Sequence, residues 1–526
     1  MELLDWIVII FYIGGLIFLG WFLGLKQKTS EDYYLAGRKL PWFPIGFSTM
    51  ATQLGAVSFI SAPAFVALRP NGGLIWLGYE LGLPLAMALL MFLFFPVFHS
   101  LKIISVYEYL ERRYDVRVRV LMSLIFQISR GLATGVTVYA AAIVVSVVLQ
   151  IPLWITILMI GAVAMIYELF GGIHIDIISD TIQMIVIILG ILITGFVGLH
   201  LIGGWHAIGK FLDPSRLTAI NFSAHGLGDG QDFGFWPLFF GGFFLYASYY
   251  GCDQSQVQRE FSARNLDDCK KSLLFNGIFR FPIVLGYCLV GLILGTYVTQ
   301  NSAFLNKLPQ GNYDYLLPTF VIENMPPGIV GFILIAIMAA AMSSLDSSIN
   351  SLSAATVEDI YKRLGKKKVD TDKEMKLSKT FTFLWGMFCI GFAFFVKNIS
   401  PTIIEAINKI GSAFYGPILA VFFAGIVFKK SRPLPAIFGL GTGVAFNLYL
   451  WFFVPSVSWL WWNAIGFLIA LIIILVGSYL SSKPHPINQM KIPPEKKIWK
   501  ISYSILALYT IFLIALLFFL PKILTY

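Results

Sequence analysis

The sequence predicts an all-α integral membrane protein that crosses the bilayer about fourteen times. Of its 526 residues, 58% are hydrophobic and only 13% are charged, which excludes an ordinary soluble domain. Apolar runs of about 20 residues, the length needed to cross a hydrocarbon layer roughly 30 Å thick, recur along the chain. Lys and Arg are concentrated in alternate loops between these runs, which is typical of a multi-pass protein.

Each apolar run is expected to form one membrane-spanning helix. The first run is longer than the apolar part of a signal peptide and no small-residue cleavage site follows it, so we expect it to persist as a helix. The runs are 3–25, 42–68, 73–98, 119–149, 152–170, 177–203, 232–254, 272–299, 327–356, 377–397, 402–428, 433–454, 457–480 and 499–521.

The distribution of Lys and Arg predicts the orientation, because cytoplasmic loops retain these residues. We expect both termini outside and a multi-pass location in the plasma membrane, or the inner membrane of a bacterium. The net charge of +10 then faces anionic lipid headgroups and implies no nucleic-acid partner. The inward loops are 26–41, 101–119, 255–271, 357–379, 429–432 and 481–500.

Signatures of enzymes and ATP-driven pumps are missing from the sequence. It has no Walker A, HExxH or GxSxG motif, and its loops leave no room for a soluble catalytic domain. The four cysteines are scattered, with no CxxC pair and no His at ligand spacing, so they imply neither a disulfide framework nor a metal site. We therefore expect no enzyme activity, and look for polar chemistry inside the membrane.

The stretch "AAAMSSLDSSINSLSA", residues 339–354, puts polar groups into the ninth run. Ala340, Ser343, Asp346 and Asn350 share one face of a helix and form a stripe of oxygens. Small and hydroxyl residues also join packed membrane helices, but an ionisable residue at this depth is a functional candidate. A hard cation could bind here together with carbonyls freed at a helix break, which "STMATQLGAVSFISAP" predicts near Gly55.

Other charged groups also lie in the apolar runs. Asp180 is deep enough to need a cation or hydroxyl partner, whereas Asp176 is expected at headgroup level. Arg130 lies about 16 Å into its run and must face a counter-charge or water. Two interpretations of Arg130 stay open, namely a salt bridge with Glu80 or contact with an anionic substrate, and Arg280 has the same two.

Several stretches together resemble the sodium:solute symporter family, which includes bacterial galactose, sialate and proline symporters and animal glucose, iodide and monocarboxylate carriers. The resemblance implies a LeuT-type fold with two inverted five-helix repeats, in spans two to six and seven to eleven. The implied domains are 1–41, 42–203 (first repeat), 204–231 (external loop), 232–428 (second repeat) and 429–526. The stretches are "DYYLAGRKLPWFPIGFS", "VYEYLERRYDVRVR", "YELFGGIHIDIISDTIQ", "SYYGCDQSQVQREFSAR", "AAAMSSLDSSINSLSAATVEDIY" and "SAFYGPILAVFFAGIVFKK".

The resemblance also implies site residues. The common sodium site would use the carbonyls of Ala51, Leu54 and Ala340 and the hydroxyls of Ser343 and Ser344. A second sodium site, present in some members, would use Asp180, Ser343, Asp346 and Ser347. The substrate positions would be Gln53, Ser58, Glu80, Arg130, Tyr246, Arg280 and Asn408, with Tyr249 as a gate.

Asp346 departs from the relatives compared, which carry Ser or Thr at this position. Two carboxylates beside one sodium ion would leave a net negative charge in a low dielectric. Asp346 is therefore protonated, directed to another partner, or part of a tighter cation site, and the number of sodium ions, one or two, stays open.

The function that follows is sodium-coupled import of a small polar solute by alternating access, with a monomer as the transport unit. The two arginines favour an anion such as a sugar acid, sialate or monocarboxylate, whereas Glu80 favours a neutral sugar. Proton coupling through Asp180 and Asp346 is a rival. A channel would need a continuous polar face on several helices, and a sensor an appended domain, so we rank both below transport.

Overall fold

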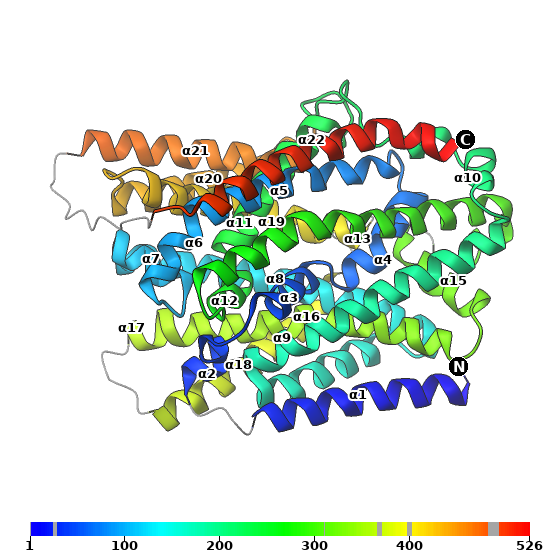
Figure 1. The fold of residues 1–526 in the computed structure, drawn as a ribbon, viewed down its shortest axis with the longest axis horizontal. Helices are drawn as coiled ribbons and strands as arrows, with labels where there is room; N and C mark the ends of the chain where they lie inside the picture. Colours follow the sequence, from blue (N-terminus) through cyan, green and yellow to red (C-terminus); the bar gives the residue numbers. More distant parts are fainter. Residues whose placement is uncertain are drawn as a thin grey trace.

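The computed structural model describes residues 2–24, 29–309, 311–364, 371–396, 402–481 and 494–525, and within these ranges it contains helices and no β-strand. The long helices lie side by side, and both ends of the chain are at the same end of the bundle (Figure 1). The helices of the first half are α1 (Leu3–Gly24), α2 (Ser30–Leu35), α3 (Trp42–Gln53), α4 (Ala56–Leu68), α5 (Leu83–Leu89), α6 (Phe95–Leu101), α7 (Val106–Arg113), α8 (Val116–Leu149), α9 (Leu153–Ile202), α10 (His206–Phe211), α11 (Phe235–Cys252) and α12 (Gln254–Phe261), with a 3-10 segment, η2, at Leu74–Gly82 and a π segment at Leu90–Phe94.

Among the described residues, ten helices are long and apolar enough to cross a membrane, and the bent pair α3 and α4 makes eleven. Fourteen crossings and outward termini stay predictions. The remaining helices are α13 (Leu266–Gln300), α14 (Ser302–Leu305), α15 (Leu316–Asn324), α16 (Ile329–Ala355), α17 (Lys362–Leu364), α18 (Thr371–Ala393), α19 (Ile403–Val427), α20 (Pro433–Phe453), α21 (Trp459–Leu480) and α22 (Lys497–Thr525), with a π segment at Thr356–Tyr361 after α16.

The helix break expected in the second apolar run is confirmed. α3 ends at Gln53, α4 begins at Ala56, and the two are bent by 51°. Gly55 is extended at this break, and a Cβ there would lie 2.3 Å from the Ser344 Oγ and 2.9 Å from the Ala340 carbonyl oxygen. Glycine therefore lets the break lie directly against α16.

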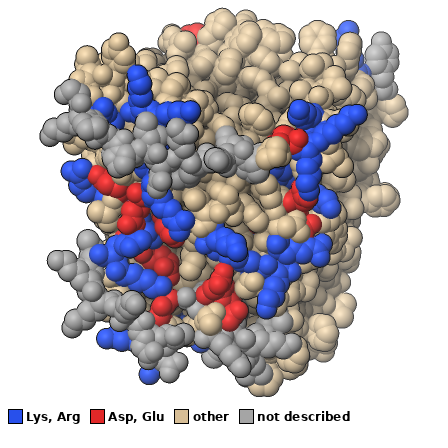
Figure 2. Space-filling view, turned by 60° about the vertical axis from the view of Figure 1, so that its left-hand side comes forward, with Lys and Arg blue, Asp and Glu red and all other residues tan. Residues whose placement is uncertain are grey.

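One predicted inward loop is wrong in part. Residues 255–271 contain α12 and the start of α13, and Arg259 of α12 is fully buried. Charged residues do gather at the end of the bundle where α7 and α17 lie (Figure 2), and these helices carry Arg112, Arg113, Lys362 and Arg363. A concentration of basic residues at one end of the bundle is typical of the cytoplasmic face of a membrane protein.

Candidate transport site

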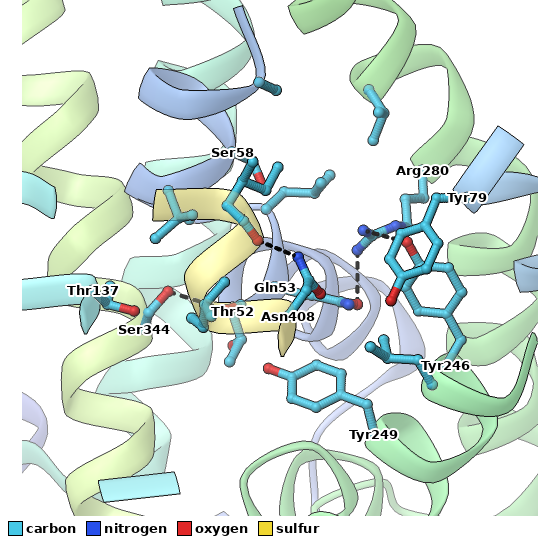
Figure 3. Close-up of a pocket in the computed structure, with 18 of the residues that line it drawn as sticks. Thr52, Gln53, Ser58, Tyr79, Thr137, Tyr246, Tyr249, Arg280, Ser344 and Asn408 are labelled. Atoms are coloured by element: carbon cyan, nitrogen blue, oxygen red, sulfur yellow. Dashed lines mark hydrogen bonds between the residues drawn. The ribbon is translucent and has the colours of Figure 1, made fainter. Parts of the chain in front are cut away.

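A pocket lies where the break between α3 and α4 faces α8, α11, α13, α16 and α19 (Figure 3). It encloses about 890 Å³, including the space on its open side. The structure brings together all the predicted substrate and gate residues, because the following line this pocket: Gln53, Ser58, Glu80, Arg130, Tyr246, Tyr249, Arg280 and Asn408.

One wall of the pocket is an ion pair fixed by hydrogen bonds. The Arg280 Nε donates to the Glu80 Oε2 at 2.7 Å and its Nη1 donates to the Gln53 Oε1 at 2.7 Å. The Tyr246 hydroxyl donates to the Glu80 Oε1 at 2.7 Å, and the Arg280 guanidinium lies over the Tyr246 ring (Figure 3). Both charges are buried and paired, so this wall presents oriented polar groups and little net charge.

Arg130 also lines the pocket, and its ion-pair partner is not Glu80, the partner considered from the sequence. The Arg130 guanidinium pairs with Asp253, at the break between α11 and α12, whereas Glu80 is bound to Arg280. Asp253 also caps α12, since its Oδ1 accepts from the Ser255 backbone N–H at 2.9 Å. Arg130 lies over the Tyr249 ring, with its carbon 4.8 Å from the ring centroid. Sequence reasoning had not assigned Asp253 a role.

The predicted common sodium site lies at the contact between the helix break and α16. The Ser344 hydroxyl donates to the carbonyl of Thr52 at 3.0 Å and to that of Ala340 at 3.3 Å. The Ser343 hydroxyl is buried and lies within reach of the Asp180 carboxylate. These neutral oxygens fit a hard monovalent cation, which would be held by hydroxyls of α16 and carbonyls near the end of α3, where Ala51 and Leu54 lie.

The residues expected at a second sodium site are arranged around an internal cation. The Ser48 hydroxyl donates to the Asp180 Oδ2 at 2.5 Å, and the Arg259 Nη2 lies 3.2 Å from the same oxygen. The same guanidinium contacts the Ser347 hydroxyl. Arg259 therefore already places a positive charge at the Asp180 carboxylate. Asp346 instead faces two acidic residues of α9.

The comparisons with known proteins agree with this geometry. The sodium:solute symporter family matches residues 33–443, which is more than half of the chain. The chain belongs to the sodium:solute symporter family. Members of this family are transporters rather than enzymes, and the multi-pass membrane location and the all-helical LeuT-type fold are confirmed.

Three of the relatives are named for the transport of sialic acid, monocarboxylates and iodide. The Aliivibrio fischeri sodium/sialic acid symporter NanT is 29% identical over 485 residues, which cover 91% of this chain and 93% of NanT. The Xenopus laevis sodium-coupled monocarboxylate transporter 1 is 30% identical, covering 82% of this chain and 68% of the relative. The human sodium/iodide cotransporter is 28% identical, covering 82% and 67%.

A solved sodium-coupled sialic acid symporter, in a substrate-bound outward-open state, superposes on this chain with a TM-score of 0.79 at 26% identity. The superposition covers 91% of this chain and 98% of the solved one. The nucleobase-cation symporter Mhp1 superposes with a TM-score of 0.56 at 11% identity, covering 89% and 97%, and this likeness shows the fold alone.

Proposed function

We propose that this sodium:solute symporter imports a small anionic solute together with one Na⁺ by alternating access, as a monomer. The observation that carries the proposal is the sharing of one pocket by the two predicted sites. Leu54 and Ser344 of the helix break and α16 line the same space as Arg130 and Arg280. An ion at the break would therefore order the wall against which the solute binds.

The work of uptake comes from the sodium gradient and the membrane potential. A cation at the break would join α3 and α4 to α16, and so favour the conformation that binds solute. Each Na⁺ moved inward gains about 2.3 kcal/mol per 100 mV of potential. One ion is proposed because Arg259 already supplies the positive charge at Asp180.

An anionic solute is supported by the charges that line the pocket. Two arginines and one glutamate face it, and Arg130 is the guanidinium whose partner, Asp253, is not among the lining residues. Relatives named for sialic acid and monocarboxylates agree with this choice. A neutral sugar is the second candidate, favoured by the pairing of Glu80 with Arg280, which leaves hydroxyl and amide groups to bind a polyol.

Uptake into proteoliposomes tests the coupling ion. We expect an imposed sodium gradient to drive accumulation of sialate, a sugar acid or a monocarboxylate, and an equal proton gradient to drive none. Uptake that follows the proton gradient and ignores sodium would reject the proposal.

Thermal-shift measurements in sodium test the solute class. Acids are expected to stabilise the protein, and Arg130→Gln is expected to abolish that effect. Asp253→Asn is the matched variant, because it removes the competing carboxylate and should strengthen binding of acids. Stabilisation by neutral hexoses alone would reject an anionic solute and favour a neutral sugar as the substrate.

A further inference from the structure

Three buried carboxylates meet where α9 packs on α16. Glu168 and Asp176 come from α9 and Asp346 comes from α16, and one oxygen of each lies within 4.8 Å of the other two. None of the three side chains is exposed, and none lines the transport pocket. We call them the carboxylate triad. The expectation that Asp176 lies at headgroup level is therefore wrong, because the side chain is enclosed by protein.

A break in α9 makes this meeting possible. Glu168 and Asp176 are eight residues apart, which is about 12 Å along a straight helix. The helix is interrupted at Gly172, which has a φ of 53° and a ψ of −166°. A Cβ at Gly172 would lie 2.7 Å from the carbonyl oxygen of Tyr33. Both the left-handed conformation and the close packing require glycine, and the bend lets the two carboxylates face one point.

Most oxygens of the triad have no hydrogen-bond donor. The Asn350 Nδ2 donates to the Glu168 Oε1 at 2.6 Å, and the Ser347 backbone N–H donates to the Asp346 Oδ1 at 2.8 Å. The other four oxygens, the Glu168 Oε2, both oxygens of Asp176 and the Asp346 Oδ2, are buried and accept no hydrogen bond from an N–H or a hydroxyl of the described residues. The carboxyls of Glu168 and Asp176 lie close enough to hydrogen-bond to each other when one of them carries a proton. Buried carboxylates of this kind require a cation or protons.

Arg259 is a positive charge that acts on Glu168 and Asp176, but its donors are used elsewhere. It donates to the Ser48 hydroxyl at 2.8 Å and to the Ser255 carbonyl at 2.6 Å, and it forms the ion pair with Asp180. Arg259 therefore balances Asp180 and leaves the charge of the triad uncompensated.

We propose that the carboxylate triad binds a divalent, oxygen-seeking metal cation at a site separate from the sodium site. Three oxygens that share one Ca²⁺ ion at 2.3–2.6 Å lie up to about 4.5 Å apart. The triad oxygens, all within 4.8 Å of one another, allow such an arrangement. The charge also favours a divalent ion, because with all three carboxyls ionised a monovalent ion would leave two negative charges uncompensated and a divalent ion would leave one. A metal here would join α9 to α16 through carboxylates from both helices.

Equilibrium dialysis of the purified full chain, stripped with EDTA, against Ca²⁺ or Mn²⁺ tests the site in the presence of sodium. We expect one divalent ion per chain, and affinity at least tenfold weaker in Asp346→Asn and in Glu168→Gln. Asp314→Asn is the matched control, since Asp314 is a buried carboxyl outside the triad whose Oδ2 accepts from the Ile403 backbone N–H, and this variant should bind divalent ions like the wild type.

The wild-type protein itself keeps the test decisive if a variant fails to fold. Folded wild type that binds neither Ca²⁺ nor Mn²⁺ between pH 6 and 9 would show that the triad holds only protons, and would overturn the inference. Binding of ²²Na⁺ that is lost in Asp346→Asn, without divalent binding, would also overturn it. Sodium-driven uptake is a separate readout, so failure of the proposed symport with intact divalent binding would leave this inference standing.

Discussion

Two opposite faces of α16 would bind cations by different means if both proposals hold. Ser344 points to the helix break, where every oxygen is a hydroxyl or a carbonyl. Asp346, two residues later and about 200° around the helix, points to the carboxylates of α9. Cation affinity rises with the number of charged ligands. Neutral oxygens are expected to bind a coupling ion weakly enough for it to leave in every transport cycle. The carboxylates of the triad are expected to bind an ion tightly enough for it to stay.

Gly55→Ala is expected to have the largest effect, because it disrupts the contact between the helix break and the Ser344 side of α16. The added Cβ would lie 2.3 Å from the Ser344 Oγ and 2.9 Å from the Ala340 carbonyl oxygen, which is backbone and cannot move away easily. We expect sodium-driven uptake to fall below detection in proteoliposomes while divalent binding persists. Gly391→Ala is the control, because no atom lies within 4 Å of a Cβ there. Uptake at the wild-type rate in Gly55→Ala would contradict the close approach.

Ser344→Ala and Asp346→Asn are expected to differ in their effect on the sodium dependence of uptake. A hydrogen bond or ligand to a charged group contributes about 1.5–3 kcal/mol, so loss of the Ser344 hydroxyl should raise the sodium concentration for half-maximal uptake roughly tenfold to hundredfold. Asp346→Asn should change that concentration by less than about threefold, because its oxygens face α9.

The control for this pair is Ser351→Ala, since the Ser351 hydroxyl donates to the carbonyl of Ser348 in its own helix. Equal shifts in the sodium dependence of Ser344→Ala and Asp346→Asn would mean that one site serves both faces, and the comparison would fail.

Most of the long helices were predictable because their length is set by the thickness of the bilayer, and ten of the described helices, or eleven with the bent pair, are long and apolar enough to cross it. The break at Gly55 was predictable as well, because glycine and hydroxyl residues interrupt an otherwise apolar run. The burial of Arg259 was not predictable. A basic residue after an apolar run is typical of a cytoplasmic loop, and α12, which carries Arg259, has only eight residues. The local signal was Asp253 followed by eight residues without glycine or proline, the start of a capped helix.

The identity of the residues that line the site was predictable from the family resemblance, but the ion pairs between them were not. The resemblance gave pocket residues that the structure brings together, but it could not show which charge pairs with which. The sequence allows an ion pair between Arg130 and Glu80. In the structure, the packing of η2, α11 and α13 pairs Glu80 with Arg280 instead. The triad depends on a bend in α9 and a contact 170 residues away, from Asp176 to Asp346, and no local pattern in the sequence reports such a contact.

The smallest expected effect is the pH dependence of stability that comes from Asp314, a buried carboxyl outside the triad. It lies outside the membrane-spanning helices, and burial raises its pKa to about 7 from an ordinary value of 3.8. Because the pKa is higher in the folded protein, its contribution to stability is present in full below about pH 4 and is lost as the pH rises through 7.

Thermal unfolding between pH 4.5 and 7.5 checks this prediction. We expect the difference in Tm between wild type and Asp314→Asn to change by about a few degrees over that range, with the wild type losing stability relative to the variant as the pH rises. The Ile403 backbone N–H favours the charged form and limits the change. A pH-independent difference would mean that Asp314 stays ionised, and that burial alone does not force a carboxyl in this fold to take a proton. The need of the triad for a metal would then be weaker as well.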